Sequence, residues 1–121
     1  MIKRKHYIEK IRGFYDSDLI KIITGIRRCG KSVVLNQIKE EIEQDGKSVL
    51  FLNFEDKRIS SKIQNWNDLL NYVEENTDKD KKWYLFFDEI QSINGWQDAV
   101  KTLRLYNYSV FITGSNSKLL S

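Results

Sequence analysis

Proline is absent from this 121-residue chain, and cysteine and histidine occur once each. A single cysteine excludes an internal disulfide and fits a reducing compartment, so we expect a cytoplasmic protein. No run of about 18 apolar residues occurs, and the N-terminus lacks the apolar segment of a secretory signal. We therefore expect neither a membrane span nor a membrane partner. His6 has no ligand partners nearby in the sequence and is predicted to lie on the surface.

A long stretch of one charge is also missing. The net charge is +3, and lysines and arginines alternate with acids along most of the chain. Proteins that bind nucleic acid usually carry a basic stripe, so nucleic acid is a partner that the sequence leaves open without supporting it. The sequence identifies no partner protein. Its length suits one domain with a core of its own.

What the chain does have is one complete G-x-x-x-x-G-K-[ST] pattern. It is formed by Gly25, Ile26, Arg27, Arg28, Cys29, Gly30, Lys31 and Ser32. In such a loop the glycines let backbone N–H groups face phosphate oxygens, the lysine reaches the β- and γ-phosphates, and the hydroxyl ligates Mg²⁺. The alternative interpretation is an ordinary glycine-containing turn before a helix.

The flanking segments favour the phosphate loop. Leu19–Thr24 is a short apolar run rich in β-branched residues, which predicts a strand, and Lys31–Gln44 carries apolar residues at helical spacing. A phosphate at the start of that helix meets free N–H groups and the positive end of the helix dipole. We therefore predict that residues 25–32 bind ATP or ADP with Mg²⁺. Lys31 is assigned a catalytic role and Ser32 a metal-ligating one.

Three side chains inside the loop receive lesser roles. Arg27 and Arg28 occupy variable positions of the pattern and are expected to point to solvent. Cys29 lies near a helix N-terminus and two arginines, which favours the thiolate. Phosphoryl transfer needs no cysteine nucleophile, so Cys29 is not assigned a catalytic role.

The rest of the chain alternates between apolar runs of strand length and amphipathic segments of helix length. The predicted strands are Ser48–Phe54, Trp83–Phe87 and Tyr108–Thr113, and the predicted helices are Arg4–Phe14, Trp66–Glu75 and Gly95–Tyr106. Glu55–Asn65 is polar and is predicted to be a loop. The three tryptophans lie on regular apolar faces and are expected in the core. Strands that alternate with helices predict an α/β fold with a parallel sheet and right-handed crossovers.

Two acids follow the third predicted strand. Four apolar residues and then Asp88 and Glu89 make the Walker B form, on a later strand than the phosphate loop. We predict that Asp88 helps to hold Mg²⁺, directly or through water, and that Glu89 orients and polarises the water that attacks the γ-phosphate. The alternative for Glu89 is a helix N-cap or a surface acid.

The fourth predicted strand ends in a polar run, Thr113 to Asn116. Ligands of open α/β sheets bind at the carboxyl ends of strands, so this run lies beside the phosphate loop if the fourth strand neighbours the first. Asn116 is then placed to hydrogen-bond the γ-phosphate or the attacking water, with Thr113 and Ser115 as lesser candidates. The alternative is a polar turn that leaves the strand.

Together these segments resemble the AAA+-type ATPases of bacteria and archaea, which typically carry a C-terminal domain of unassigned function. The segments are GIRRCGKS, FLNFED (Phe51–Asp56), FFDEIQ (Phe86–Gln91), NGW (Asn94–Trp96) and ITGSNSKLLS (Ile112–Ser121). The resemblance runs from about Leu19 to the last residue. It implies that residues 25–32 are Walker A, Asp88 and Glu89 Walker B, and Asn116 the sensor-1 residue. The implied strand order is 5-1-4-3-2.

The same resemblance implies a three-layer P-loop NTPase fold that is truncated after the sensor-1 strand. Residues 1–18 would be an N-terminal helical segment and residues 19–121 a partial ATPase domain. A fifth strand, a helical lid, an arginine finger and a C-terminal domain would lie beyond these residues. Without the fifth strand, Leu19–Thr24 is left at a sheet edge. We expect the chain to self-associate or to cover that edge with Met1–Asp18.

Several functions share the phosphate loop. The first interpretation is Mg²⁺-dependent ATP binding and hydrolysis, and Glu89 favours it. The second is a nucleotide-gated binding module with negligible turnover, which the absent lid and arginine finger favour. A small-molecule kinase would need an acceptor pocket and a lid, of which the sequence has no sign. A GTPase is disfavoured because no [NT]-K-x-D guanine motif occurs.

Overall fold

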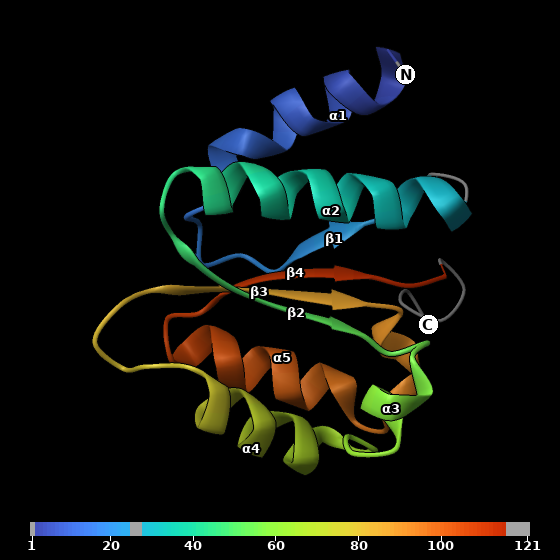
Figure 1. The fold of residues 1–121 in the computed structure, drawn as a ribbon, viewed down its shortest axis with the longest axis vertical. Helices are drawn as coiled ribbons and strands as arrows, with labels where there is room; N and C mark the ends of the chain where they lie inside the picture. Colours follow the sequence, from blue (N-terminus) through green and yellow to red (C-terminus); the bar gives the residue numbers. More distant parts are fainter. Residues whose placement is uncertain (1, 25–27, 116–121) are drawn as a thin grey trace.

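Four parallel strands form the central layer of the protein (Figure 1). The computed structural model describes the backbone of residues 2–24 and 28–115, and side chains from His6 to Thr24 and from Gly30 to Ser115. The strands are β1 (Lys21–Ile23), β2 (Ser48–Asn53), β3 (Trp83–Asp88) and β4 (Ser109–Thr113). Their order across the sheet is β1-β4-β3-β2, and every neighbouring pair is parallel. The predicted α/β class and the 1-4-3-2 part of the predicted strand order are therefore confirmed.

Helix α2 (Arg28–Gln44) covers one face of the sheet, and α1 (Ile2–Ile11) packs against α2 (Figure 1). The apolar residues of α2 recur at helical spacing, so they form one stripe that packs on the strands. The buried residues of this layer are Ile8, Ile23, Val34, Leu35, Ile38, Ile42, Tyr84, Phe86 and Phe111. The rings of Phe86 and Phe111 stack on neighbouring strands with their centroids 4.7 Å apart. This face therefore packs α2 against β3 and β4.

Helices α4 (Trp66–Asn76) and α5 (Trp96–Leu105) cover the other face (Figure 1). Successive residues of a strand point to opposite faces, so Leu85 and Phe87 of β3 face these helices while Tyr84 and Phe86 face α2. Helix α5 contributes Trp96, Ala99, Val100 and Leu103 to the core, and these residues recur at helical spacing along its sequence. The sheet is thus buried on both faces, as its near-continuous apolar strands predict.

Four details differ from the sequence-based expectation. The predicted loop Glu55–Asn65 contains a short helix, α3 (Lys57–Ser60), because the Asp56 side chain caps its first turn by accepting a hydrogen bond from the Arg58 N–H. Strand β1 is shorter than Leu19–Thr24. Trp66 is 44% exposed, since it opens α4 and lies over Gly95 rather than under the helix. Phe14 is 49% exposed, because the chain leaves α1 after Ile11 and winds more tightly through the 3₁₀ helix Arg12–Phe14.

Polar contacts tie the segment after α1 to the sheet and to α2. Arg12 donates two hydrogen bonds to the Glu41 carboxylate, at 3.0 and 2.7 Å, and the Tyr15 hydroxyl donates a third at 3.0 Å. The Tyr84 hydroxyl donates to the Asp16 carboxylate. These bonds stabilise the ionised acids, so the pKa values of Asp16 and Glu41 lie below their usual range. The predicted boundary between residues 1–18 and 19–121 stays a prediction.

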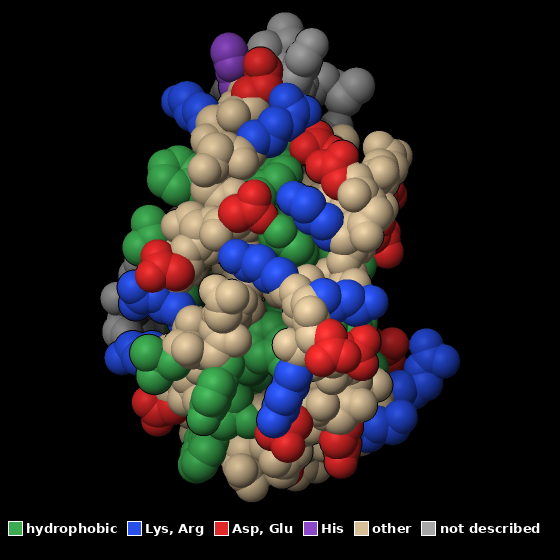
Figure 2. All heavy atoms as spheres, turned by 90° about the vertical axis from the view of Figure 1, so that its left-hand side faces the viewer, with side chains coloured by type: hydrophobic (Ala, Val, Ile, Leu, Met, Phe, Trp, Pro, Cys, Tyr) green, Lys and Arg blue, Asp and Glu red, His purple; other side chains and the backbone are tan. Residues whose placement is uncertain are grey.

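No helix in the described part of the chain is both long and apolar enough to span a bilayer. Figure 2 looks along the sheet from the end at which the strands begin, and its basic and acidic side chains are interspersed on that face. His6 is exposed, as predicted.

Candidate functional site

The four strands run in one direction, so their carboxyl ends meet at one edge of the sheet, where α2 begins (Figure 1). Open parallel sheets bind ligands at this edge because helix N-termini and strand ends meet there. The edge brings together the start of α2 with Lys31 and Ser32, the end of β3 with Asp88 and Glu89, and the end of β4 with Thr113. Residues far apart in the sequence therefore share one small region.

Asp88 is the centre of this region and is 4% exposed. The Ser32 hydroxyl donates to its Oδ2 at 2.8 Å, although the two residues are 56 positions apart. The Thr113 hydroxyl donates to its Oδ1 at 2.5 Å. A buried carboxylate is costly unless it is hydrogen-bonded, and here each oxygen has a donor. Asp88 is thus fixed against the first turn of α2. Its Oδ2 and the Ser32 Oγ, two oxygens of the hard type that can ligate a metal ion, are in contact.

Lys31 is 7% exposed, and its ammonium donates to the Gly114 carbonyl at 2.7 Å. The bond joins the first turn of α2 to the residue that follows β4. A buried ammonium needs acceptors, and the Gly114 backbone carbonyl supplies one. Lys31 is therefore held at the edge of the sheet, beside the end of the strand that the sequence interpretation had placed next to the loop.

Glu89 has a left-handed backbone conformation, with φ 58° and ψ 52°. Its N–H donates to the Thr113 hydroxyl at 3.0 Å, and its Oε1 accepts a hydrogen bond of 2.7 Å from the Gln91 side-chain amide. The alternative that Glu89 caps a helix is not supported, because its side chain makes no cap hydrogen bond to the 3₁₀ helix Ile90–Ser92 that follows. A non-glycine residue in this region of backbone space is strained, and such residues cluster at functional sites.

Part of the predicted site lies outside the described residues. These are Gly25, Ile26 and Arg27 of the phosphate loop, and Asn116 of the polar run after β4. Arg28 and Cys29 belong to the first turn of α2 by their backbone, but their side chains are not described. The assigned roles of these six residues stay predictions.

Comparison with known proteins matches residues 17–121 to the family described as AAA domain. The match covers most of the chain and begins just before the strand that leads into the phosphate loop. The chain belongs to the AAA domain family. Membership indicates a nucleotide-binding, ATPase-like module, and it agrees with the all-parallel sheet and with the position of Lys31 and Ser32 at its carboxyl edge.

Two relatives of this AAA domain protein are known only as uncharacterised proteins. One, from Haemophilus influenzae, is 39% identical over 126 aligned positions that cover the whole chain and 31% of the relative. The other, from Methanocaldococcus jannaschii, is 42% identical over 105 positions that cover 84% of the chain and 22% of the relative. The chain therefore spans less than a third of the length of either relative.

Two residues of the candidate site, Thr113 and Gln91, have contacts that the sequence did not predict. Thr113 was a lesser candidate for contacting phosphate, but it is fully buried and its hydroxyl serves Asp88 and the Glu89 N–H. Gln91, which contacts Glu89, received no role at all. The sequence did contain a signal for Thr113. Its hydroxyl side chain ends a buried strand, and that strand neighbours the one that precedes Asp88 and Glu89. For Gln91 the only signal was its spacing of two residues from Glu89.

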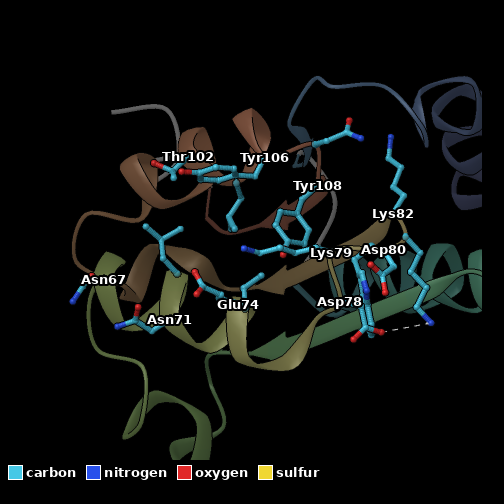
Figure 3. Close-up of a pocket in the computed structure, with 16 residues that line it drawn as sticks. Asn67, Asn71, Glu74, Asp78, Lys79, Asp80, Lys82, Thr102, Tyr106 and Tyr108 are labelled. Carbon is cyan, nitrogen blue, oxygen red and sulfur yellow. Dashed lines mark ion pairs between the residues drawn. The ribbon is translucent and has the colours of Figure 1, made fainter.

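A hollow of about 780 Å³ lies at the opposite end of the AAA domain (Figure 3). Helix α4, the C-terminal end of α5 and the segments before β3 and β4 form it, and Trp83 lies at the start of β3. Its charged lining residues have both signs, and Asp78 and Lys81 form an ion pair of 3.9 Å. It contains none of the residues assigned to phosphate or metal, so it is separate from the candidate nucleotide site.

Proposed function

We propose that this chain binds ATP with Mg²⁺ and, in the intact protein, hydrolyses it. The observation that carries the proposal is the contact of Ser32 with Asp88 at 2.8 Å, beside Lys31. A phosphate-loop hydroxyl and a Walker B acid need to meet at one metal ion, and the sequence separates them by 56 residues. An ordinary glycine turn before a helix would give no reason for that contact. We assign the activity to the cytoplasm, where the thiol of Cys29 stays reduced.

The oxygen donors present suit Mg²⁺. This ion prefers hard oxygen ligands in an octahedron with bonds of about 2.0–2.1 Å, so that adjacent ligands lie about 2.9 Å apart. The distance between Ser32 Oγ and Asp88 Oδ2 is 2.8 Å. Among the described residues, no group of three or more His, Cys, Asp or Glu side chains could hold a metal ion. The Ser32 hydroxyl and the Asp88 carboxylate form a smaller donor set, which fits an ion that takes its remaining ligands from phosphates and water. Bound there, Mg²⁺ would neutralise charge on the phosphates.

Different residues of the chain would bind the phosphates and activate the water. Residues 25–32 would cradle the phosphates with backbone N–H groups, and the Lys31 ammonium would exchange the Gly114 carbonyl for β- and γ-phosphate oxygens. Glu89 would orient a water molecule and accept its proton while the water oxygen bonds to the γ-phosphorus. The bond from that phosphorus to the ADP oxygen then breaks. Asn116 would contact the γ-phosphate or the water.

A second candidate function is a nucleotide-gated binding module with negligible turnover. The bond from Lys31 to the Gly114 carbonyl favours it, because nucleotide binding would break a link between α2 and the end of β4. The two functions differ in one measurable quantity, the release of inorganic phosphate. Both require nucleotide binding, and only the first requires Glu89 to act on water.

Replacing Lys31 by alanine should weaken the binding of Mg-ATP at least about 10-fold, since a hydrogen bond to a charged group contributes about 1.5–3 kcal/mol. Calorimetric titration of this chain measures the change. Lys39→Ala is the matched control, because Lys39 lies on the same helix, and its ammonium pairs with the exposed Glu43 at 3.6 Å and lies 5.7 Å from the centre of the Phe51 ring. Equal affinities for the wild type and Lys31→Ala would contradict the assignment of the phosphate site.

Glu89→Gln should leave ATP binding nearly unchanged and lower the turnover of the intact protein by about 10²-fold or more, a typical contribution of a positioned base. Phosphate release is the measurement, and Glu75→Gln, at an exposed position of α4, is the control. Wild-type turnover by the Glu89→Gln variant would exclude Glu89 as the group that activates water. Binding with no phosphate release by either protein would favour the nucleotide-gated module.

A further inference from the structure

Gln91 makes an incomplete set of hydrogen bonds beside the candidate catalytic acid. Its Nε2 donates to Glu89 Oε1 at 2.7 Å, while its own Oε1 is buried and has no hydrogen-bond partner among the residues that the structure describes. The reverse orientation of the amide would place its oxygen against the carboxylate, which is repulsive, so the N–H group must face Glu89. The Gln91 amide therefore keeps its hydrogen bond to Glu89 and leaves its own oxygen unpaired.

A buried acceptor without a partner costs about 1–3 kcal/mol, and an apolar side chain of similar length would avoid that cost. Buried polar atoms in folded proteins are nearly always paired, so an exception calls for a physical reason. The reason available here is the other end of the same amide, which holds a carboxylate. The Glu89 backbone is strained at the same point, with φ 58°, so two unfavourable features meet within three residues.

We propose that Gln91 is a positioning residue that holds Glu89 Oε1 and thereby leaves Oε2 to face the attacking water. The inference rests on the proposed ATP hydrolysis and assigns a further residue to it. A base acts only from the correct geometry, and a carboxylate with one oxygen fixed has lost most of its rotational freedom. A neutral amide also suits this task better than Lys or Arg, because it orients the carboxylate without forming an ion pair with it.

Backbone contacts at Glu89 complete the arrangement. Its N–H donates to the Thr113 hydroxyl, which also donates to Asp88. The Glu89 carbonyl accepts a hydrogen bond from the Ser92 hydroxyl at 3.3 Å. The main chain of Glu89 is therefore held by β4 and by the turn that follows, and Gln91 is the side chain that holds its carboxylate. Removing the Gln91 amide should free the carboxylate while leaving its backbone in place.

The test is the turnover of ATP by the intact protein with Gln91→Met, which keeps the length of the side chain and removes the donor. We expect kcat to fall between about 10- and 100-fold with KM unchanged. The thermal midpoint of unfolding should stay equal or rise, because the unpaired acceptor is removed as well. A purely structural role would lower the midpoint instead. Gln97→Met makes the same change at an exposed position of α5 and should alter neither quantity.

Two further variants separate this inference from the proposed function. Gln91→Glu keeps the shape but replaces the donor by an acceptor, so kcat should fall as well. In a Glu89→Gln background, Gln91→Met should lower kcat by less than about twofold, because residues that act through one another are not additive. Wild-type or higher kcat in Gln91→Met, with Glu89→Gln inactive, would overturn the role of Gln91 alone. Full activity of Glu89→Gln would overturn both.

Discussion

Thr113 links the two acids of the site through one hydroxyl. It donates to Asp88 Oδ1 at 2.5 Å and accepts from the Glu89 N–H at 3.0 Å, and it is fully buried. Its donor and acceptor capacities are both used inside the protein. Its role is therefore to orient Asp88 and the Glu89 backbone rather than to contact phosphate.

Thr113→Val should lower the free energy of unfolding by about 1–3 kcal/mol, since it leaves the Glu89 N–H and an Asp88 oxygen without their partner. It should also raise the Mg²⁺ concentration needed for half-maximal ATP turnover, because the Asp88 carboxylate loses a bond that orients it. Urea unfolding and a Mg²⁺ titration measure the two effects. Thr102→Val is the control, because the Thr102 hydroxyl donates to the Asp98 carbonyl of its own helix. An unchanged Mg²⁺ requirement would contradict this role for Thr113.

At the scale of elements, Gly95 explains how α4 and α5 begin side by side. Gly95 precedes α5 with φ +75°, and a Cβ added there would lie 2.6 Å from Trp66 Cδ1. The Trp66 N–H donates to the Asn94 carbonyl at 2.9 Å, and Asn65 and Asn94 form an isolated parallel bridge. The NGW segment therefore has a structural task, because only glycine combines this backbone conformation with the close approach of the indole.

The segment before β1 joins the sheet through a buried lysine. The Lys21 ammonium donates to the Ser17 carbonyl and to the Ser109 hydroxyl, both at 2.8 Å, and lies 4.8 Å from the centre of the Phe111 ring. Lys21 is 5% exposed, and this burial lowers its pKa to about 8. The unfolded chain keeps the proton up to the ordinary pKa of 10.5. Folding therefore releases a proton between these values, and stability rises as pH increases through that window.

Lys21→Met should remove this dependence on pH. The free energy of unfolding of the wild type, measured relative to the variant, should increase by about 2 kcal/mol between about pH 7 and pH 9.5. Urea unfolding of the wild type and the variant at both pH values is the measurement. Lys101→Met, at an exposed position of α5, provides the control. If the difference in the free energy of unfolding between the wild type and Lys21→Met is the same at both pH values, burial does not destabilise the Lys21 ammonium.

At the scale of the whole molecule, β1 is an edge strand with a partly open face. Ile22 is 39% exposed and Leu19 is 52% exposed. One contact from the N-terminal helix reaches this edge, since the Tyr7 hydroxyl donates to the Ile22 carbonyl at 3.3 Å. Coverage of the edge by the N-terminal segment is thus supported by this bond and by the bond from Lys21 to the Ser17 carbonyl, and self-association stays a prediction. Unpaired backbone groups on an apolar edge favour pairing with another chain.

We expect this chain to self-associate through β1, and Ile22→Lys should shift it toward the monomer, because a charged side chain blocks edge pairing. Sedimentation velocity over a range of concentrations measures the shift. Leu105→Lys is the matched control, since Leu105 is 83% exposed on α5 and away from the edge. Equal effects of the two substitutions would indicate nonspecific hydrophobic association rather than pairing through the edge strand. A wild-type chain that is monomeric throughout would contradict the prediction.

Most of the fold was predictable, because the information that specifies it is local. Each predicted helix or strand from Leu19 onward has a counterpart, since the period of apolar residues is visible in a single segment. The alternation of strands and helices predicted a parallel sheet, but the order β1-β4-β3-β2 was expected only through the family resemblance. The errors fell where one interaction decides the outcome. Asp56 caps α3 inside an expected loop, and the 3₁₀ helix turns Phe14 outward.

The candidate site divides in the same way. Residue types alone pointed to Lys31, Ser32, Asp88 and Glu89, because phosphate and Mg²⁺ select a lysine, a hydroxyl and carboxylates at fixed spacing. The sequence did not contain the distances between them, since Ser32 and Asp88 are 56 residues apart and meet only when β3 and α2 pack together. Tertiary structure alone made Thr113 the partner of both acids and left Gln91 with half of its amide unpaired. Hydrogen bonds between segments depend on how those segments pack, and packing joins residues that no local pattern connects.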